Sequence, residues 1–325
     1  MLPIAMTTGA SVFLIYDATP CLHRFGPFLS DVVGIIQPMF IFSMLFLTFC
    51  RIEPKDLKPH RWHWWLLLIQ GGLFSLLGLV AYLLISMLSV ESGDWVVLIE
   101  CAMLCLICPT ATAAAVVTRK LGGDVPGITT YIILINILAA VLVPLIVPLV
   151  HPVAEIDFWM AFSMIMAKVF PLLILPCLAA WLVRYLFPKL HRWFLKFPDL
   201  PFYIWSLALC LAIAITTKSI MRSDMSLFML AMMSLISLIC CVFQFGMGRF
   251  IGGRYSPRIP VPAVEERGKE VRKITAGQAM GQKNTIFAIW MAYTFMTPES
   301  SIVGGFYSIW HNIYNSWQLY RHSRS

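Results

Sequence analysis

Charged residues are scarce in this chain of 325 residues. Only 12% of them are Asp, Glu, Lys or Arg, whereas 59% are hydrophobic, and the mean hydropathy is +0.81. Soluble domains carry about 25% charged residues, so this chain has too few polar side chains to cover the surface of a soluble protein. Apolar runs long enough to cross a bilayer recur from end to end. The sequence therefore predicts an all-α polytopic membrane protein.

The sequence lacks a combination of residues typical of an enzyme active site. The nine cysteines have no paired metal-ligand spacing and lie mostly inside apolar runs, where small thiols are ordinary packing residues. Six of the seven histidines fall in predicted loops or at helix ends, and only His311 lies well within a predicted helix. No nucleophile, base and carboxylate form the pattern of a catalytic site. We expect no enzymatic activity and no cofactor or metal centre.

Ten apolar runs predict about ten transmembrane helices in a single transmembrane domain, 1–325. Five runs precede the midpoint and five follow it, which suggests two repeats of approximately 1–150 and 151–325. An odd number of spans in each half inverts the second half relative to the first. The runs cover residues 2–16, 32–50, 62–88, 95–118, 126–150, 158–183, 202–217, 225–248, 274–297 and 300–318.

The basic residues predict the orientation of these helices. With the N-terminus inside, nineteen of the 24 Lys and Arg residues fall in inner loops, and only Arg24, Lys218 and Arg222 fall outside. This positive-inside bias accounts for the net charge of +8, so no nucleic-acid partner is implied. We expect a multi-pass protein of the plasma (inner) membrane with both termini cytoplasmic. Residues 252–270, with their prolines and mixed charges, are expected to form a solvated cytoplasmic connector.

Two lysines, Lys168 and Lys283, fall inside predicted spans. Each lies about ten residues into its helix and therefore roughly 15 Å deep, near the bilayer centre. Charges at that depth are costly and usually mark a site or a pathway. The alternative is that each lysine meets backbone carbonyls or a buried carboxylate, such as Glu100, and only holds helices together.

Two predicted helices carry interruptions at matching places in the two halves. The fourth breaks at Cys108-Pro-Thr110, because proline cannot donate to the helix ladder, and the ninth is loosened by Gly277 and Gly281 on either side of Gln278. A discontinuous helix at the same place in each half indicates a transporter whose site lies at the repeat interface.

The half-helices that follow the two breaks predict the charge of the ligand. Thr110 or Thr112 can cap the first of them, and Asn284 or Thr285 can cap the second. Each half-helix would aim its partly positive N-terminus at the membrane midplane, where Lys283 also lies. We therefore expect an anion as the guest. Broken helices also expose carbonyls, so a Na⁺ site in the same crossing is geometrically allowed.

Three stretches resemble a known family. They are CPTATAAAVVT from Cys108 to Thr118, the segment from Gly277 to Ala288, and SIWHNIYNS from Ser308 to Ser316. They are similar to the signature stretches of the bile acid:sodium symporter family. In that family the fourth helix typically reads Cys-Pro-Gly-Gly-Thr-Ala-Ser-Asn, the ninth carries Glu-x-Gly-x-Gln-Asn, and the tenth carries Trp-His-Asn.

The resemblance implies ten helices in two inverted five-helix repeats. One group of helices would form a panel domain, and the other a core domain built round the crossing of the fourth and ninth helices. Members carry bile acids, steroid conjugates, small organic acids and similar anions, usually with Na⁺. We add His311 and Asn312, from the Trp-His-Asn stretch, to the candidate substrate-binding residues.

The same resemblance marks where ion ligands have been replaced. The family's fourth-helix sodium ligands Ser-Asn correspond to Ala114 and Ala115, and its ninth-helix glutamate corresponds to Gln278. Hydroxyl ligands of the fifth helix fall in the register of Ile128 and Ile132.

Gln70 and Gln282 keep their family identities, and Lys283 takes the position of the family's asparagine. Our hypothesis is that the ammonium of Lys283 replaces bound cations, so that transport is uncoupled from Na⁺ or coupled to protonation of the lysine. The alternative is a one-residue slip, in which Gly281 and Asn284 take the glycine and asparagine places and Lys283 turns to another helix.

Three functions follow. The first is a secondary transporter that moves an organic anion by alternating access, with a conventional Na⁺-coupled symporter as a variant. The second is a binding or sensing membrane protein on the same fold, which the loss of ion ligands permits. The third is an intramembrane enzyme, for which the sequence offers no catalytic set.

Overall fold

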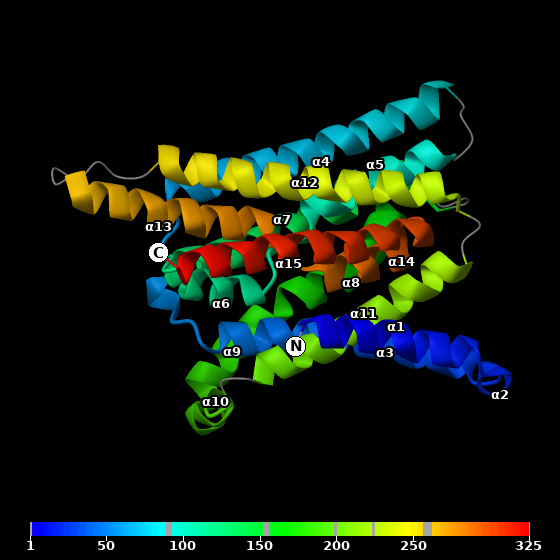
Figure 1. Cartoon of the computed structure of the whole chain (residues 1–325), viewed down its shortest axis with the longest axis horizontal. Coiled ribbons are helices and arrows are strands. Elements are labelled where there is room, and N and C mark those ends of the chain that lie inside the picture. Colours follow the sequence, from blue (N-terminus) through cyan, green and yellow to red (C-terminus); the bar gives the residue numbers. More distant parts are fainter. Residues whose placement is uncertain are drawn as a thin grey trace.

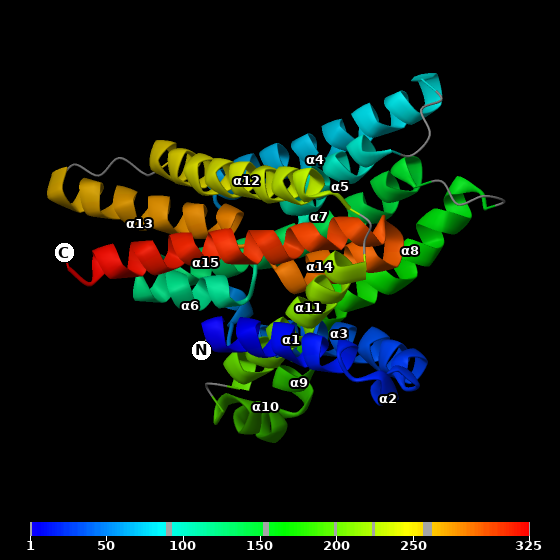
Figure 2. The ribbon, with the colours of Figure 1, turned by 45° about the vertical axis from the view of Figure 1, so that its right-hand side comes forward.

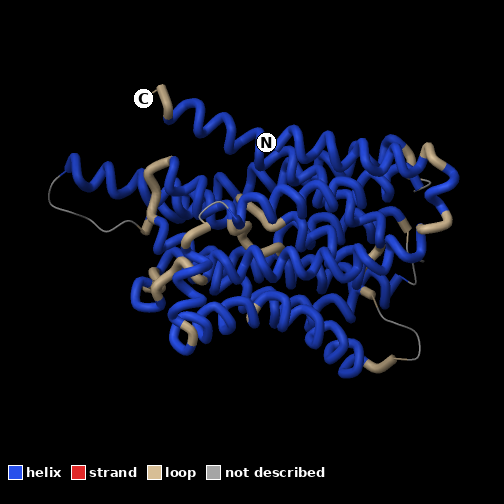
Figure 3. Tube along the Cα trace, turned by 90° about the horizontal axis from the view of Figure 1, so that it is seen from below, coloured by secondary structure: helices blue, strands red, loops and turns tan. Residues whose placement is uncertain are grey.

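The computed structural model describes residues 2–88, 93–151, 156–197, 200–222, 225–255 and 262–324. In these ranges the regular structure is helical, and no strand occurs beyond one isolated bridge (Figure 3). The helices are α1 (Leu2–Asp17), α2 (Pro20–His23), α3 (Gly26–Phe49), η1 (Pro54–Asp56), α4 (Arg61–Leu88), α5 (Asp94–Ile107), α6 (Ala113–Lys120), α7 (Val125–Val150), α8 (Phe158–Leu173), α9 (Leu175–Leu186), α10 (Pro188–Leu195), α11 (Leu200–Arg222), α12 (Leu227–Arg254), α13 (Pro262–Gly281), α14 (Thr285–Phe295), η2 (Pro298–Ser301) and α15 (Ile302–His322).

Each of the ten apolar runs forms a helix or a pair of consecutive helices. Among the described residues, five helices, α3, α4, α7, α11 and α12, are long and apolar enough by themselves to cross a membrane. A sixth span results if α8 and α9 are counted together. The all-helical membrane architecture is therefore confirmed, whereas the count of ten spans stays a prediction.

Local sequence signals fix where several helices begin. The side chains of Asp124, Asp157 and Ser226 cap α7, α8 and α12 by accepting a hydrogen bond from a backbone N–H of the first turn. Such caps satisfy donors that the helix itself leaves without a partner. The apolar runs therefore become helices with defined first turns.

One bend was not expected from the sequence. The run at 158–183 predicts a single helix, but the chain turns by 40° at Ile174, between α8 and α9. Pro171 and Pro176 flank this residue, and each removes a backbone donor from the ladder.

The helices pack as two groups, visible in Figures 1 and 2. One group contains α1, α3, α9, α10 and α11, and the other contains α4 to α7 and α12 to α15. Helix α8 contacts both groups, packing on α7 and on α3 and α9. In the second group α14 is buried from Thr285 to Ala292, which suits a helix that is apolar all round.

One prediction about the ninth run is corrected. Gly277 does not loosen the helix, because α13 continues through it and ends at Gly281. Both glycines serve packing instead: a Cβ at Gly277 would meet Arg249 of α12, and one at Gly281 would meet the Phe245 ring. The predicted connector 252–270 includes the end of α12 at Arg254 and the first residues of α13 from Pro262, and residues 256–261 lie outside the described residues. Its solvated, cytoplasmic character stays a prediction.

Candidate functional site

The two broken helices cross at their interruptions, as predicted. Thr110, in the gap between α5 and α6, forms an isolated antiparallel bridge with Lys283, in the gap between α13 and α14. The N–H of Ala111 donates to the carbonyl of Gln282 at 2.9 Å, and the N–H of Asn284 donates to the carbonyl of Pro109 at 2.8 Å. The non-helical backbone of each broken helix therefore supplies hydrogen-bond partners for that of the other at the centre of the fold.

Side-chain donors hold the carbonyl ends of α5 and α13 next to this bridge. The Nζ of Lys283 donates to the carbonyl of Leu106 at 3.1 Å. The carbonyl ends of helices carry partial negative charge, so an ammonium is favourable there. Three further donors act in the same way: Gln244 Nε2 on Cys105 O (3.1 Å), Tyr307 Oη on Gly281 O (2.8 Å) and Thr110 Oγ1 on Ala279 O (2.5 Å).

The N-termini of the second half-helices differ in their caps. Asn284 is the N-cap of α14, and its Oδ1 accepts from the N–H of Phe287 at 3.2 Å, as predicted. Thr112 occupies the N-cap position of α6 but makes no capping hydrogen bond. The expectation of a threonine cap on α6 was wrong, because the Thr110 hydroxyl is turned to α13 instead.

A cavity lies where the two helix groups meet, beside the crossing. It holds about 380 Å³ of space, counting space continuous with the outside. The first residues of α6 and α14 line it, together with side chains from α3, α11 and α15. The lining residues are Met44, Ala111, Thr112, Trp205, Leu209, Gln282, Lys283, Asn284, Thr285, Ile286, Ser308 and His311.

Two buried polar atoms in this cavity have no hydrogen-bond partner in the described structure. They are Oε1 of Gln282 and Nδ1 of His311, on side chains that are only 3% and 4% exposed. Buried polar atoms are almost always paired, so these two are available to a bound ligand. The hydroxyls of Thr285 and Ser308 lie 2.5 Å apart in the same lining.

Six of the seven candidate substrate residues were placed at or next to this cavity, but not all line it. Thr112, Lys283, Asn284, Thr285 and His311 do. Thr110 lies in the crossing behind it, and Asn312 donates to the Ser308 carbonyl of its own helix at 2.6 Å. The structure adds lining residues that the sequence did not indicate, namely Met44, Ala111, Trp205, Leu209, Ile286 and Ser308.

Four residues that the resemblance aligns with ion ligands of the family are apolar: Ala114, Ala115, Ile128 and Ile132. Ala114 is fully buried in a cluster that includes Ile128 and Tyr131, and Ala115 packs against the same cluster. Ile132 is buried in the neighbouring core. Side chains of this kind offer no oxygen to a cation.

Gln70 and Gln278 are hydrogen-bonded to other protein groups. Gln70 donates to the carbonyl of Cys108 at 3.4 Å. Gln278 donates to Asn315 Oδ1 at 2.9 Å and to Gln318 Oε1 at 2.7 Å, which ties α13 to α15. Gln282 is the member of this set that lines the cavity.

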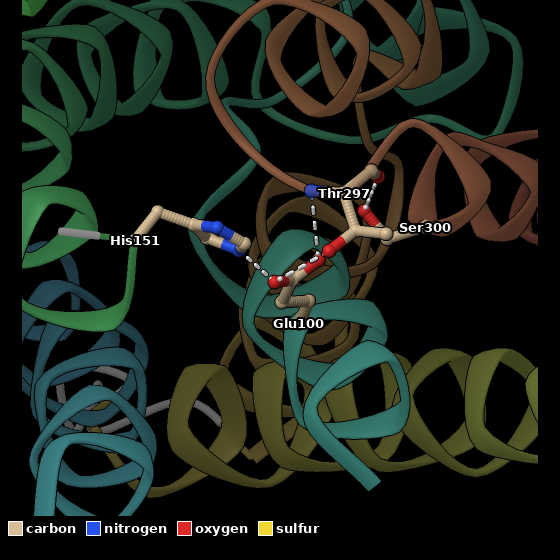
Figure 4. A network of polar contacts seen from close by, with 4 residues as sticks. All are labelled: Glu100, His151, Thr297 and Ser300. Atoms are coloured by element: carbon tan, nitrogen blue, oxygen red, sulfur yellow. Dashed lines mark hydrogen bonds and ion pairs between the residues drawn. The ribbon is translucent and has the colours of Figure 1, made fainter. Parts of the chain in front are cut away.

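The three intramembrane charges are in different environments. Lys283 is 1% exposed and contacts a backbone carbonyl, and it also lines the cavity. Lys168 lies on an exposed face of α8, with its Nζ 5.5 Å from the centre of the Phe295 ring. Glu100 is buried and is bound by His151 and Thr297 rather than by a lysine (Figure 4).

Sequence comparison agrees with the family resemblance. The chain matches the SBF-like CPA transporter family, which is bile acid:sodium symporter-like, over residues 7–320. A comparison with curated proteins finds no match. Because the family match covers nearly the whole chain, including both broken helices and the cavity, this protein belongs to the SBF-like CPA transporter family.

Proposed function

We propose that this protein is a secondary transporter that moves an organic anion across the membrane by alternating access. The observation that carries the proposal is the cavity at the crossing, where the N-termini of α6 and α14 and the side chain of Lys283 converge. Helix N-termini and an ammonium all favour negative charge. The family to which the chain belongs is one of membrane transporters.

The arrangement of helices supports alternating access. The cavity takes Met44 from α3 and Trp205 and Leu209 from α11 on one side, and the broken helices on the other. We assign α1, α3, α8, α9 and α11 to a panel domain and the remaining long helices to a core domain. Each domain would then take helices from both of the inverted repeats. Rocking of one domain against the other would expose a site between them to each side in turn.

The lining indicates an anion with an apolar body. Met44, Trp205, Leu209 and Ile286 supply apolar surface, while the hydroxyls, amides and His311 are concentrated near the half-helix ends. A ligand site of this kind is typically apolar with a few placed polar groups that fix orientation. A carboxylate or sulfate group would point to α6 and α14, and a hydrophobic body would lie against α3 and α11.

We further propose that Lys283 takes the place of bound sodium ions. Its Nζ lies at the carbonyl end of α5, the kind of position at which carbonyls of a broken helix coordinate Na⁺. Neighbouring carbonyls already accept from Gln244, Tyr307 and Thr110. With Ala114 and Ala115 at the former ligand positions, the positive charge that the anion needs comes from the protein itself.

Ligand screening followed by flux measurement tests this function. A thermal-shift screen of bile acids, steroid sulfates, keto acids and other carboxylates should find an anion that raises the apparent stability of the purified protein. Proteoliposomes containing the protein should then take up that anion, and preloaded unlabelled anion should accelerate exchange. Saturable binding without any flux would instead establish the alternative, a binding or sensing protein on a transporter fold.

A further inference from the structure

Helix α10 lies at the edge of the molecule, beyond α9 (Figures 1 and 2). Its inner side is held against the end of α3. Nε2 of the buried His191 donates to the carbonyl of Cys50 at 2.7 Å, and the rings of Phe194 and Phe46 meet edge to face with their centres 5.2 Å apart. The orientation of α10 is therefore fixed by a hydrogen bond and an aromatic contact, which leaves its other sides exposed.

One exposed side of α10 is apolar. Leu190 and Trp193, together with Phe197 just beyond the end of the helix, recur at a spacing that places them on one side, and each is between 44% and 48% exposed. The rings of Trp193 and Phe197 have their centres 5.0 Å apart and form one continuous aromatic surface. Tyr185 and Phe187, at the end of α9, are exposed as well. Trp and Tyr are the aromatic residues typical of the interface between bilayer and water.

The neighbouring side of α10 is basic. Lys189, Arg192 and Lys196 follow one another at a helical spacing, and all three side chains are exposed. None of them forms an ion pair within the part of the chain that the structure describes. No Asp or Glu occurs in the sequence between Asp157 and Asp199, so α8, α9 and α10 offer no carboxylate to these cations.

The adjoining loop after α3 adds to the positive charge. Its Glu53 is already paired, with Lys55 at 2.5 Å and with Arg184 of α9 at 3.8 Å. The guanidinium of Arg51 donates to the carbonyl of Phe197 at 2.8 Å, which ties this loop to the end of α10. Among the described side chains of this corner, basic groups therefore outnumber acidic ones.

We propose that α10 is a docking surface for anionic phospholipid, with its apolar side against the upper part of the acyl chains and its basic side at the lipid phosphates. A helix that is apolar on one side and basic on another lies in the plane of the membrane interface. An apolar side alone would fit lipid at any depth or another protein, whereas three adjacent cations select the layer that contains phosphate groups. The positive-inside bias predicts that this layer belongs to the cytoplasmic leaflet, where anionic lipids attract basic segments.

Spin-label accessibility in bilayers tests where the apolar side of α10 lies. The full chain carries Leu190→Cys or, as the control, Lys120→Cys at the exposed end of α6, and the exposed Cys21 is replaced by Ser. The vesicles contain phosphatidylcholine and phosphatidylglycerol. Oxygen, which concentrates in lipid, should relax the label at position 190 more than a water-soluble nickel complex does, and the order should be reversed at position 120.

Two outcomes of this measurement would overturn the proposal. Equal access of the nickel complex to both labels would place α10 in water. Protection of the label at position 190 from both reagents would show that protein covers the apolar side, so that a second copy of the chain, and not lipid, would be its partner.

Lipid titration followed by native mass spectrometry tests the basic side of α10. Lys189→Gln/Arg192→Gln removes one Lys and one Arg from α10, and the matched control Arg119→Gln/Lys120→Gln removes the same two residue types from the end of α6. All four side chains are exposed, so neither variant alters the core. The Kd of the full chain for phosphatidylglycerol in detergent should rise about tenfold in the α10 variant, because each basic residue near a lipid phosphate adds attraction. It should stay unchanged in the α6 variant.

The result is compared with phosphatidylcholine, whose Kd should be the same in the parent and both variants. An equal loss of phosphatidylglycerol affinity in the two variants would show diffuse attraction to the net charge, and no loss in the α10 variant would show that α10 does not contact the phosphate. Either result would overturn the proposal. None of the residues that line the cavity lies on α9 or α10, and no transported anion is used, so failure of the proposed transport function would leave these outcomes unchanged.

Discussion

At the scale of single residues, Lys283 answers the question of why an apolar chain places an ammonium near its centre. The lysine is buried, contacts the carbonyl end of α5, and lines the cavity. A contact with a backbone carbonyl is what a purely structural lysine would make, whereas its place in the lining is what a ligand-binding lysine requires. Substitution separates these roles.

Replacing Lys283 by Ala should weaken anion binding. Loss of one charge at a distance of several Å removes roughly 1–2 kcal/mol of attraction, or about tenfold in Kd. Lys283→Arg should retain more affinity than Lys283→Ala, although its planar fork does not reproduce an ammonium. Competition binding with the best ligand from the screen compares the Kd of the parent with those of the two variants. Equal affinity of parent and Ala variant would make Lys283 a helix-pairing residue only.

His311 should contribute to binding through its Nδ1 atom, which has no partner in the described structure. His311→Ala should lower affinity roughly two- to tenfold, the value of one neutral hydrogen bond. Asn312→Ala is the control, because Asn312 is the next residue on α15 but bonds its own helix instead of lining the cavity. A loss of affinity as large in Asn312→Ala would show that the effect comes from α15 packing.

Residues of the crossing could be predicted from the sequence, because local chemistry determines them. Proline at position 109 breaks the fourth run, and Asn284 caps α14 as expected. Met44 and Trp205 could not be assigned to the cavity, since they come from helices whose facing depends on packing. The partner of Glu100 was missed for the same reason: His151 is 51 residues away and meets it only when the helix ends come together.

At the scale of elements, the packing of α12 against α13 determines the position of α13, which is the first half of the second broken helix. Gly248 is in close approach to this helix, and a Cβ there would meet the backbone carbonyl of Ala276. Small residues let membrane helices approach in this way. Gly277 and Gly281, which the sequence predicted to loosen the ninth helix, take part in the same close contact between α12 and α13.

Gly248→Ala should therefore destabilise the protein. Forcing a methyl group into a packed backbone contact costs about 1–3 kcal/mol. Gly246→Ala, on the same helix, is the control, because a Cβ at Gly246 meets nothing within 4 Å. Thermal unfolding of the purified variants should rank Gly248→Ala below both the parent and Gly246→Ala. If the two variants unfold at the same temperature, the close approach of Gly248 to α13 does not limit stability.

At the scale of the whole molecule, the distribution of charge predicts orientation, which the helices alone do not give. Lys58 lies just before the start of α4, Asp94 is the first residue of α5, and both are exposed. The positive-inside bias places the Lys58 loop in the cytoplasm and the start of α5 outside.

Thiol labelling of intact cells tests this orientation. Lys58→Cys should react with an impermeant maleimide only after the cells are opened, and Asp94→Cys should react from outside. Cys21 should first be replaced by Ser, since it is the exposed thiol among the free cysteines. Reversed access at either position would contradict the predicted topology. Glu155, which the same orientation also places on the outer side, lies outside the described residues.

The dependence of anion binding on Na⁺ tests the central claim most directly. If Lys283 supplies the charge that sodium ions supply elsewhere in the family, the affinity for the anion should be the same in Na⁺, K⁺ and choline, because an ion that binds no state preferentially cannot shift the equilibrium. Titration of the anion into purified protein in each salt, at equal ionic strength, gives the answer. Equal Kd values are the predicted result. A strong, saturable increase in affinity with Na⁺ would contradict replacement of sodium by Lys283.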